Sequence, residues 1–283
     1  MIPGEITKWG KVILAAAGPG DPELITVKAV RYLQQADVVL TDRLVSNDIL
    51  KQYVNPSAQI IYVGKQCRRG ISTPQQTINQ LMLDYAWQGK LVVRLKGGDV
   101  SIFSNILDEL QVLVQNNIAY EIIPGITAAL GAAAYAGIPL TARDHSTAVR
   151  LLTYYKSDVV PDQYWQEIAA TNDTLVFYMS AETVEGIVSK LIRYGVGRDK
   201  HIAVIEQATT PLQQVHTANI YDYLQQFRGM SFISPSLVII GKVVALHDQF
   251  AWFTNAPERT QYFKSIASLQ NNTHNQQAHV SRA

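Results

Sequence analysis

The feature that most constrains the fold is an alternation of short apolar runs with longer amphipathic stretches in the first half of the chain. The amphipathic stretch Glu23–Ala36 repeats apolar residues at helical spacing, whereas the apolar runs have the length of buried strands. Those runs cover residues 11–18, 37–42, 58–65, 90–99 and 119–125. Strands that alternate with helices predict a mainly parallel sheet covered on both faces, which is an α/β fold.

The pattern changes after Pro124. Residues 126–140 are rich in alanine and helix-like, and residues 184–195 predict an amphipathic helix. Further strands are predicted at residues 148–155, 173–179, 201–209 and 234–246. We therefore expect two α/β domains, at residues 10–123 and 124–253. The remainder, residues 254–283, loses apolar periodicity and is rich in Asn and Gln, which predicts a disordered polar tail.

Composition excludes several classes of protein. The formal net charge of +1 provides no field that would attract nucleic acid. The chain shows neither a secretory signal pattern nor an apolar run long enough to span a membrane, so we expect a cytoplasmic protein without a membrane partner. Cys67 is the single cysteine, which rules out an intramolecular disulfide, and the histidines show no metal-ligand spacing. We therefore expect no bound metal.

Glycine-rich turns follow two of the predicted strands. The first, "AAGPGDPE", is a poor dinucleotide site, because Glu23 stands where the third glycine belongs and Asp21 would repel a pyrophosphate. The second is Gly97-Gly98-Asp99, where glycines allow close backbone approach and Asp99 can accept hydrogen bonds. Such a turn suits a ligand with hydroxyls and an ammonium group, and S-adenosylmethionine offers both. An ordinary strand-to-helix turn is the alternative interpretation of this stretch alone.

Six segments together, in the same order and spacing, resemble the tetrapyrrole methyltransferase family. They are residues 18–45, Gly64-Lys65, residues 89–99, residues 122–143, residues 174–179 and residues 234–244. The resemblance covers residues 10–246. Within the family, the stretch "YAGIPLTAR" favours the members that methylate uroporphyrinogen III over those that act on corrin rings.

The resemblance implies two α/β domains of the tetrapyrrole methylase type, a fold distinct from the Rossmann-like methyltransferases. It also implies a homodimer, with S-adenosylmethionine bound in a cleft between the domains. Carried over by motif, the cofactor-binding residues are Pro19, Gly97, Gly98, Asp99, Ile102, Thr127, Ala128, Met179 and Ala208. Ala208 stands where the family commonly has glycine.

Methyl transfer from a sulfonium needs an in-line approach to an electron-rich carbon and removal of a proton afterwards. The resemblance assigns Asp42 as the proton acceptor and Lys65 as the proton donor. Two simpler roles stay open, in which Asp42 caps the next helix and Lys65 only binds a carboxylate.

The substrate implied by the resemblance is a polycarboxylate tetrapyrrole, so its site should be basic. The candidates at predicted strand ends are Arg43, Arg68, Arg69, Lys96 and Arg143. The implied reaction converts uroporphyrinogen III to precorrin-2 in two transfers, for sirohaem or cobalamin synthesis. The alternatives are a methylase of a later corrin precursor and a cofactor-binding homologue with impaired catalysis.

Two segments depart from the family pattern. Where the family has Phe-Gly-Arg-Gly-Gly-Glu-Glu, this chain has "FSNILDE", which lacks the arginine. Residues 104–110 predict a helix with Ile106, Leu107 and Leu110 turned partly inward. Where relatives commonly show Thr-Gly-His, this chain has "TYY". Both departures bear on substrate choice more than on cofactor binding.

Overall fold

The structure, a computed structural model, describes residues 9–63, 73–155 and 160–263. These residues form two compact units that divide between Thr127 and Ala128, close to the predicted boundary after residue 123. Each unit is a sheet packed with helices, so the predicted fold class is confirmed. None of the helices in the described part of the chain has the length and apolar composition that a membrane crossing requires.

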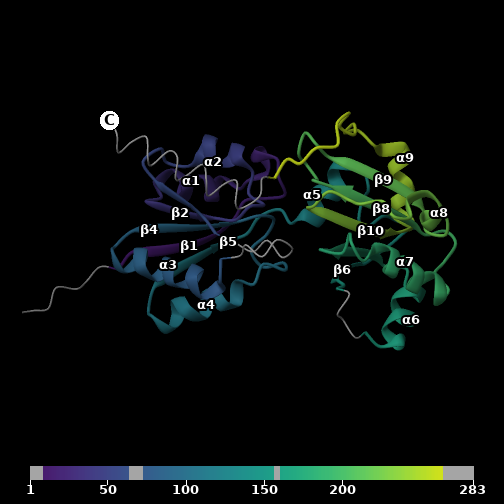
Figure 1. Cartoon of the computed structure of the whole chain (residues 1–283), viewed down its shortest axis with the longest axis horizontal. Helices are drawn as coiled ribbons and strands as arrows, with labels where there is room; N and C mark the ends of the chain where they lie inside the picture. Colours follow the sequence, from purple (N-terminus) through teal and green to yellow (C-terminus); the bar gives the residue numbers. More distant parts are fainter. Residues whose placement is uncertain (1–8, 64–72, 156–159, 264–283) are drawn as a thin grey trace, which may run out of the picture. The chain divides into compact units, whose positions relative to one another are not determined.

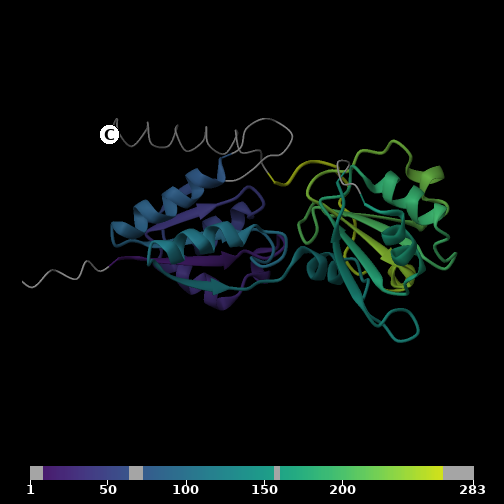
Figure 2. The same cartoon turned by 90° about the horizontal axis from the view of Figure 1, so that it is seen from below.

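The first unit is a five-stranded parallel sheet with helices on both faces (Figure 1). Its strands are β1 (Lys11–Ala16), β2 (Val38–Thr41), β3 (Gln59–Tyr62), β4 (Leu91–Lys96) and β5 (Ala119–Ile123), in the spatial order β3-β2-β4-β1-β5. A 3-10 turn at Pro22–Leu24 precedes α1 (Val27–Gln35), which lies with α2 (Asn47–Tyr53) on one face. On the other face lie α3 (Gln75–Trp87) and α4 (Ile106–Gln115), and Figure 2 shows α4, in teal, in front of the strands.

The alternating side chains of β1 explain why this sheet is covered twice. Ile13 and Ala15 pack into the cluster that contains Leu33 of α1. Val12 and Leu14 point the other way, into the cluster that contains Met82 of α3. A strand buried on both faces reads as a continuous apolar run, which is why the sequence predicts it well.

The second unit has a mixed sheet. Its strands are β6 (Val149–Thr153), β7 (Thr174–Tyr178), β8 (His201–Glu206), β9 (Gln214–Asn219) and β10 (Ser236–Gly241), in the order β6-β7-β10-β8-β9. β6 and β7 pair in parallel, whereas the other three pairs are antiparallel. The helices are α5 (Ala128–Tyr135), α6 (Asp162–Ala170), α7 (Val184–Arg193), α8 (Tyr223–Phe227), the 3-10 helix Lys242–Leu246 and α9 (His247–Phe250). The predicted strand at residues 234–246 therefore ends at Gly241.

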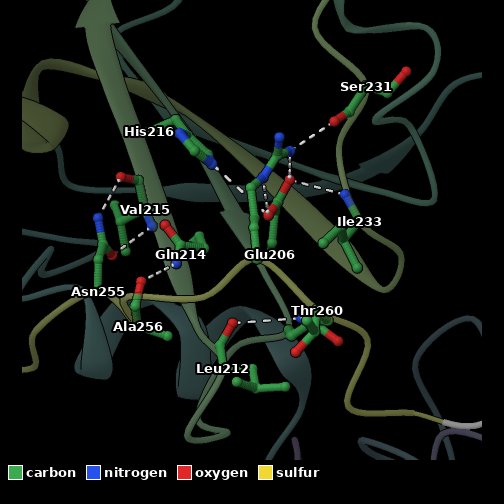
Figure 3. A network of polar contacts seen from close by, with 12 residues as sticks. Glu206, Leu212, Gln214, Val215, His216, Ser231, Ile233, Asn255, Ala256 and Thr260 are labelled. Atoms are coloured by element: carbon green, nitrogen blue, oxygen red, sulfur yellow. Dashed lines mark hydrogen bonds and ion pairs between the residues drawn. The ribbon is translucent and has the colours of Figure 1, made fainter.

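Residues 254–262, which we call the C-terminal strap, are bound to the second unit (Figure 3). The Asn255 Oδ1 atom accepts a hydrogen bond from the Val215 amide at 2.7 Å, and its Nδ2 donates to the Val215 carbonyl at 3.1 Å. This side chain thus satisfies backbone groups of the edge strand β9 as a further strand would. The prediction of a disordered tail is wrong for the strap, because polar side-chain contacts hold it without apolar periodicity. Residues 264–283 lie outside the described residues.

The strap also supplies the counter-ion of a buried carboxylate (Figure 3). Glu206, at the end of β8, is 0% exposed and accepts hydrogen bonds from Arg259 Nη2 at 2.5 Å and Nε at 3.2 Å. The Ile233 amide donates to the same carboxylate at 2.8 Å, and His216 Nε2 lies 3.8 Å away. Burial alone would raise the pKa of Glu206, but the neighbouring His216, Arg259 and Ile233 groups outweigh it and lower the pKa to about 2.

A pH titration of stability tests this contact. The folded pKa of Glu206 lies below the ordinary value, so its stabilisation is present above about pH 4.5 and is lost as the pH falls towards 2. The depression corresponds to about 3 kcal/mol at neutral pH. We expect Glu206→Gln to lower the free energy of unfolding at pH 7 and to flatten its dependence between pH 4.5 and 2, measured by urea unfolding.

Glu167→Gln is the matched control, because Glu167 pairs with Arg150 at 2.6 Å but its side chain is 62% exposed. Because an exposed ion pair contributes little, we expect the free energy of unfolding of Glu167→Gln at pH 7 to lie within about 1 kcal/mol of that of the unsubstituted protein. If the stability of Glu206→Gln depended on pH in the same way as that of the unsubstituted protein, the predicted role of the Glu206 carboxylate would be contradicted.

Candidate functional site

Two glycine turns pair with each other at the carboxyl edge of the first sheet, the edge at which its parallel strands end. The Gly18 amide donates to the Gly98 carbonyl at 3.1 Å, and the Gly98 amide donates to the Gly18 carbonyl at 2.8 Å. Both residues have positive φ, +79° and +72°, which glycine adopts without strain. The turns after β1 and β4 therefore form one backbone unit, here called the glycine platform (Gly18 and Gly98).

Asp99 joins this platform to the loop after β5. It is 8% exposed, and its Oδ1 accepts hydrogen bonds from the Ser101 amide at 2.8 Å and from the Ser101 hydroxyl. Its Oδ2 accepts from the Gly125 amide at 2.9 Å. Burial would raise the pKa of Asp99, but hydrogen bonds from Ser101, Gly125 and Val100 lower it. The sequence predicts ligand donors for this carboxylate, whereas the structure uses both of its oxygens to hold the loops.

Asp42 lies beside the same platform, directly after β2. Its Oδ2 accepts a hydrogen bond from the Gly97 amide at 3.2 Å, and its Oδ1 accepts from the Leu44 amide at 2.8 Å. A side chain at position 97 would meet Leu44, whose Cβ lies 2.8 Å from a Cβ built there. The next helix, α2, is capped by Ser46 instead. The Ser46 Oγ atom accepts a hydrogen bond from the Asp48 backbone amide at 3.2 Å. The helix-cap alternative for Asp42 is therefore wrong.

Lys96, the last residue of β4, is part of a buried ionic cluster. Its Nζ donates to Glu109 Oε2 at 3.0 Å, while Arg94 Nε donates to Glu109 Oε1 at 3.1 Å. All three side chains are buried, and desolvation followed by repulsion from Arg94 lowers the pKa of Lys96. The Lys96 ammonium, which the sequence predicts as a substrate-binding group, is therefore paired with Glu109 in the core of the first unit.

Glu109 was not among the residues predicted from the sequence, although a signal was present. Two cations inside the otherwise apolar β4 require a buried counter-charge. The helix α4 supplies it. Of the three residues predicted to turn partly inward, Ile106 and Leu110 are half-buried, whereas Leu107 is 62% exposed. The helical pattern alone gives no reason to place a glutamate inside.

The second unit gathers a separate set of candidates at one edge of its sheet. Because β10 lies antiparallel between β7 and β8, the carboxyl ends of these two strands share an edge, where Met179 and Ala208 follow them. Met179 has φ +54° and is 50% exposed, and the Tyr155 hydroxyl donates to its sulfur at 3.2 Å. Ala128 begins α5, which is tied to β7 by a 3.1 Å hydrogen bond from the Ala129 amide to the Tyr178 hydroxyl.

The remaining candidates divide by position. In the first unit, Pro19, Arg43 and Ile102 are half-buried, and Thr127 is buried. In the second unit, Arg143 is exposed. The other three basic candidates, Lys65, Arg68 and Arg69, lie outside the described residues.

The side chains at the carboxyl edge of the first sheet favour a particular kind of ligand. Two carboxylates, Asp42 and Asp99, border the glycine platform, and the nearby Lys96 ammonium points to Glu109. A ligand with positive charge and hydroxyl donors suits this set, whereas a pyrophosphate would meet two like charges. Within the described ranges, no cluster of three or more His, Cys, Asp or Glu side chains is arranged to hold a metal ion.

Comparison with known sequences gives a consistent assignment. The model of the tetrapyrrole (corrin/porphyrin) methylase family matches residues 11–223. The sirohaem synthase of Saccharophagus degradans is 45% identical over 248 residues, which are 88% of this chain and 54% of that protein. This chain therefore spans about half the length of the curated relatives it matches.

Two solved structures share the fold. A cobalamin biosynthetic enzyme, cobalt precorrin-4 methyltransferase, superposes with a TM-score of 0.73 at 29% identity, covering 83% of this chain and 95% of that chain. The uroporphyrin-III C-methyltransferase of Thermus thermophilus, complexed with S-adenosyl homocysteine, superposes with a TM-score of 0.68 at 33% identity. That superposition covers 83% of this chain and 93% of the other.

The loop-joining role of Asp99 predicts a loss of stability on substitution. In Asp99→Asn, an amide group replaces one oxygen and faces a backbone or hydroxyl donor, so we expect a loss of roughly 1.5–3 kcal/mol in the free energy of unfolding. Asp37→Asn is the control, because the Asp37 carboxylate accepts from the Leu91 amide at 2.8 Å at the opposite, exposed edge of this sheet. Urea unfolding that gives equal losses in the two variants would contradict the prediction.

Proposed function

We propose, because the chain belongs to the tetrapyrrole (corrin/porphyrin) methylase family, that it methylates uroporphyrinogen III to precorrin-2 in two successive transfers. The methyl donor is S-adenosylmethionine. One observation carries the proposal: the Asp42 carboxylate is hydrogen-bonded at 3.2 Å to the Gly97 amide, within the turn that forms the glycine platform. A candidate base and a candidate cofactor turn are thus adjacent in one unit.

The donor set of the first unit fits this cofactor. The ammonium, the sulfonium and the ribose hydroxyls all favour a site bordered by carboxylates and backbone carbonyls. When bound, S-adenosylmethionine supplies an electrophilic methyl group. On the strength of the resemblance, we propose that the residues contributing to its binding are Pro19, Gly97, Gly98, Ile102, Thr127, Ala128, Met179 and Ala208. In this proposal Asp99 acts chiefly by holding the loops around Gly98 and Gly125.

The chain's own chemical task is to position the substrate and to move one proton. A new carbon–carbon bond forms at the pyrrole while the carbon–sulfur bond breaks, and the substrate must then lose a proton. We propose Asp42 as the acceptor, because its two backbone hydrogen bonds orient the carboxylate at the carboxyl edge. Lys65 is proposed as the donor on the strength of the resemblance.

The polycarboxylate substrate requires basic partners. Lys96 is paired with Glu109 and is left out of the proposed set. The proposed partners are Arg43, which follows Asp42, and Arg143, together with Arg68 and Arg69. Arginine suits this role because its planar guanidinium binds carboxylates in a bidentate manner.

Asp42→Asn separates a base from a positioning residue. The amide keeps the side chain's size and one acceptor for the Leu44 amide, while the Gly97 amide loses its acceptor, so urea unfolding must first show that the variant is folded. The Asn side chain takes no proton at neutral pH. We expect the turnover number to fall by about 100-fold or more while the dissociation constant for S-adenosyl homocysteine stays within a few-fold. Calorimetry and steady-state kinetics measure the two quantities. A loss of affinity as large as the loss of turnover would make Asp42 a positioning residue.

An assay with labelled S-adenosylmethionine and uroporphyrinogen III tests the reaction itself. We expect a singly methylated intermediate followed by a doubly methylated product, identified by mass spectrometry. The similarity to cobalt precorrin-4 methyltransferase favours one second candidate, a later corrin precursor as substrate. Methylation of that precursor without methylation of uroporphyrinogen III would replace the proposed substrate, and binding of cofactor with no product from either would indicate an impaired homologue. Light scattering on the same sample measures whether the protein is the homodimer that the resemblance implies.

A further inference from the structure

We infer that the C-terminal strap holds the loop after β8 in the shape required for cofactor binding, and that Arg259 is a positioning residue for this loop. The inference rests on the proposed function, in which Ala208 of this loop contacts the cofactor. The loop, residues 207–213, joins β8 to β9. Neither the loop nor the strap carries a side chain proposed to take part in methyl transfer itself.

The backbone around Ala208 is strained. Gln207 and Thr209, its two neighbours, have φ values of +48° and +65°, which side-chain-bearing residues rarely adopt. Such conformations persist where the surrounding structure holds them in place. Both residues are buried, and the Gln207 amide donates to the Pro235 carbonyl at 2.7 Å. The conformation of Ala208 therefore depends on the contacts of its neighbours.

The strap provides contacts at both ends of this loop. The Gln207 side-chain Nε2 donates to the Thr260 carbonyl at 2.8 Å, and its Oε1 accepts from the Tyr262 amide at 2.6 Å. At the other end, the Ala256 amide donates to the Gln213 carbonyl at 3.1 Å. Both hydrogen-bonding groups of the Gln207 side chain are thus bound by strap backbone, which fixes the side chain in one orientation.

Gln213, which the strap binds through its carbonyl, also holds the interior of the loop through its side chain. Its side-chain Oε1 accepts from the Thr209 amide at 2.8 Å, so the residue that the strap binds also holds the second strained position. Thr210 closes the turn with a 2.7 Å hydrogen bond from its hydroxyl to the Gln207 carbonyl. The residues on each side of Ala208 are therefore each connected to the strap, one directly and one through Gln213.

Arg259 anchors the strap at the point where the loop begins. Its guanidinium binds both oxygens of Glu206, the residue immediately before Gln207, and also donates to the Ser231 carbonyl at 2.6 Å (Figure 3). Glu206 is completely buried, so this bidentate pair is the strongest polar contact between the strap and the end of β8, where the loop begins. Without it, the strap would lose its charged contact with Glu206 and keep neutral hydrogen bonds such as those of Asn255, Thr260 and Tyr262.

The experiment compares Arg259→Met with Arg150→Met in the full chain. Arg150 is the matched control, because it binds Asp173 at 2.5 Å and Glu167 at 2.6 Å at the opposite edge of the same sheet. The two arginine side chains are also similarly exposed, 34% for Arg150 and 38% for Arg259. Substituting Arg150 therefore removes an arginine that pairs with two carboxylates of the same unit, which are more exposed than Glu206, without touching the loop.

Two measurements are made on each variant. Amide hydrogen exchange of residues 207–213, followed by mass spectrometry without ligand, reports the order of the loop. Calorimetric titration with S-adenosyl homocysteine reports affinity. In Arg259→Met we expect faster exchange in the loop and a loss of affinity of about tenfold, equivalent to about 1.4 kcal/mol. In Arg150→Met we expect neither change, even if its melting temperature falls as far as that of Arg259→Met.

Several outcomes would overturn the inference. Unchanged affinity in Arg259→Met would do so whatever the exchange shows, and so would an equal loss of affinity in Arg150→Met, because general destabilisation would then explain it. If the unsubstituted chain failed to bind S-adenosyl homocysteine, the proposed function would be wrong, and the exchange measurement alone would decide whether the strap orders the loop. If Arg259→Met failed to fold, the double variant Glu206→Gln/Arg259→Met, which leaves no unpaired buried carboxylate, would be judged by the same outcomes.

Discussion

The backbone pairing of Gly18 with Gly98 is the contact on which the first unit's candidate site depends. It joins the turns after two neighbouring strands, β1 and β4, and it requires positive φ at both positions. Two carboxylates then attach the neighbouring loops, since Asp99 binds the Gly125 amide and Asp42 binds the Gly97 amide. The strand order β2-β4-β1-β5 makes these contacts possible, because the carboxyl ends of adjacent parallel strands meet at one edge.

Charged side chains of the first unit form an ionic cluster in its core. Glu109 neutralises part of the charge that Arg94 and Lys96 bring into the core, and such a buried group is costly to leave unpaired. These charges organise β4 and α4 beneath the site. The proposed binding of a polycarboxylate substrate must therefore rely on arginines outside the core, such as Arg43 and Arg143, and on the basic residues between β3 and α3.

The second unit uses a buried carboxylate in a comparable way. Glu206 receives the Arg259 guanidinium from a segment that is distant in sequence, and Gln207 next to it is bound by the same segment. A strained turn is thereby held by polar contacts rather than by apolar packing. This explains how a stretch without a hydrophobic pattern becomes part of an ordered unit, and why the edge strand β9 is satisfied by the Asn255 side chain.

The sequence by itself determined the α/β class and the parallel strands of the first unit, because buried strands read as apolar runs. It also determined the family, because six segments resemble that family in order and spacing. The resemblance to that family, and not local periodicity, assigned Asp42 as the proton acceptor and the turn from Gly97 to Asp99 to the cofactor. Only the tertiary structure decided which partner each polar group takes. Asp99 binds loop amides, Lys96 binds Glu109, and Arg259 reaches back to Glu206. These partners are far apart in sequence and satisfy buried charge, a requirement that local periodicity does not encode.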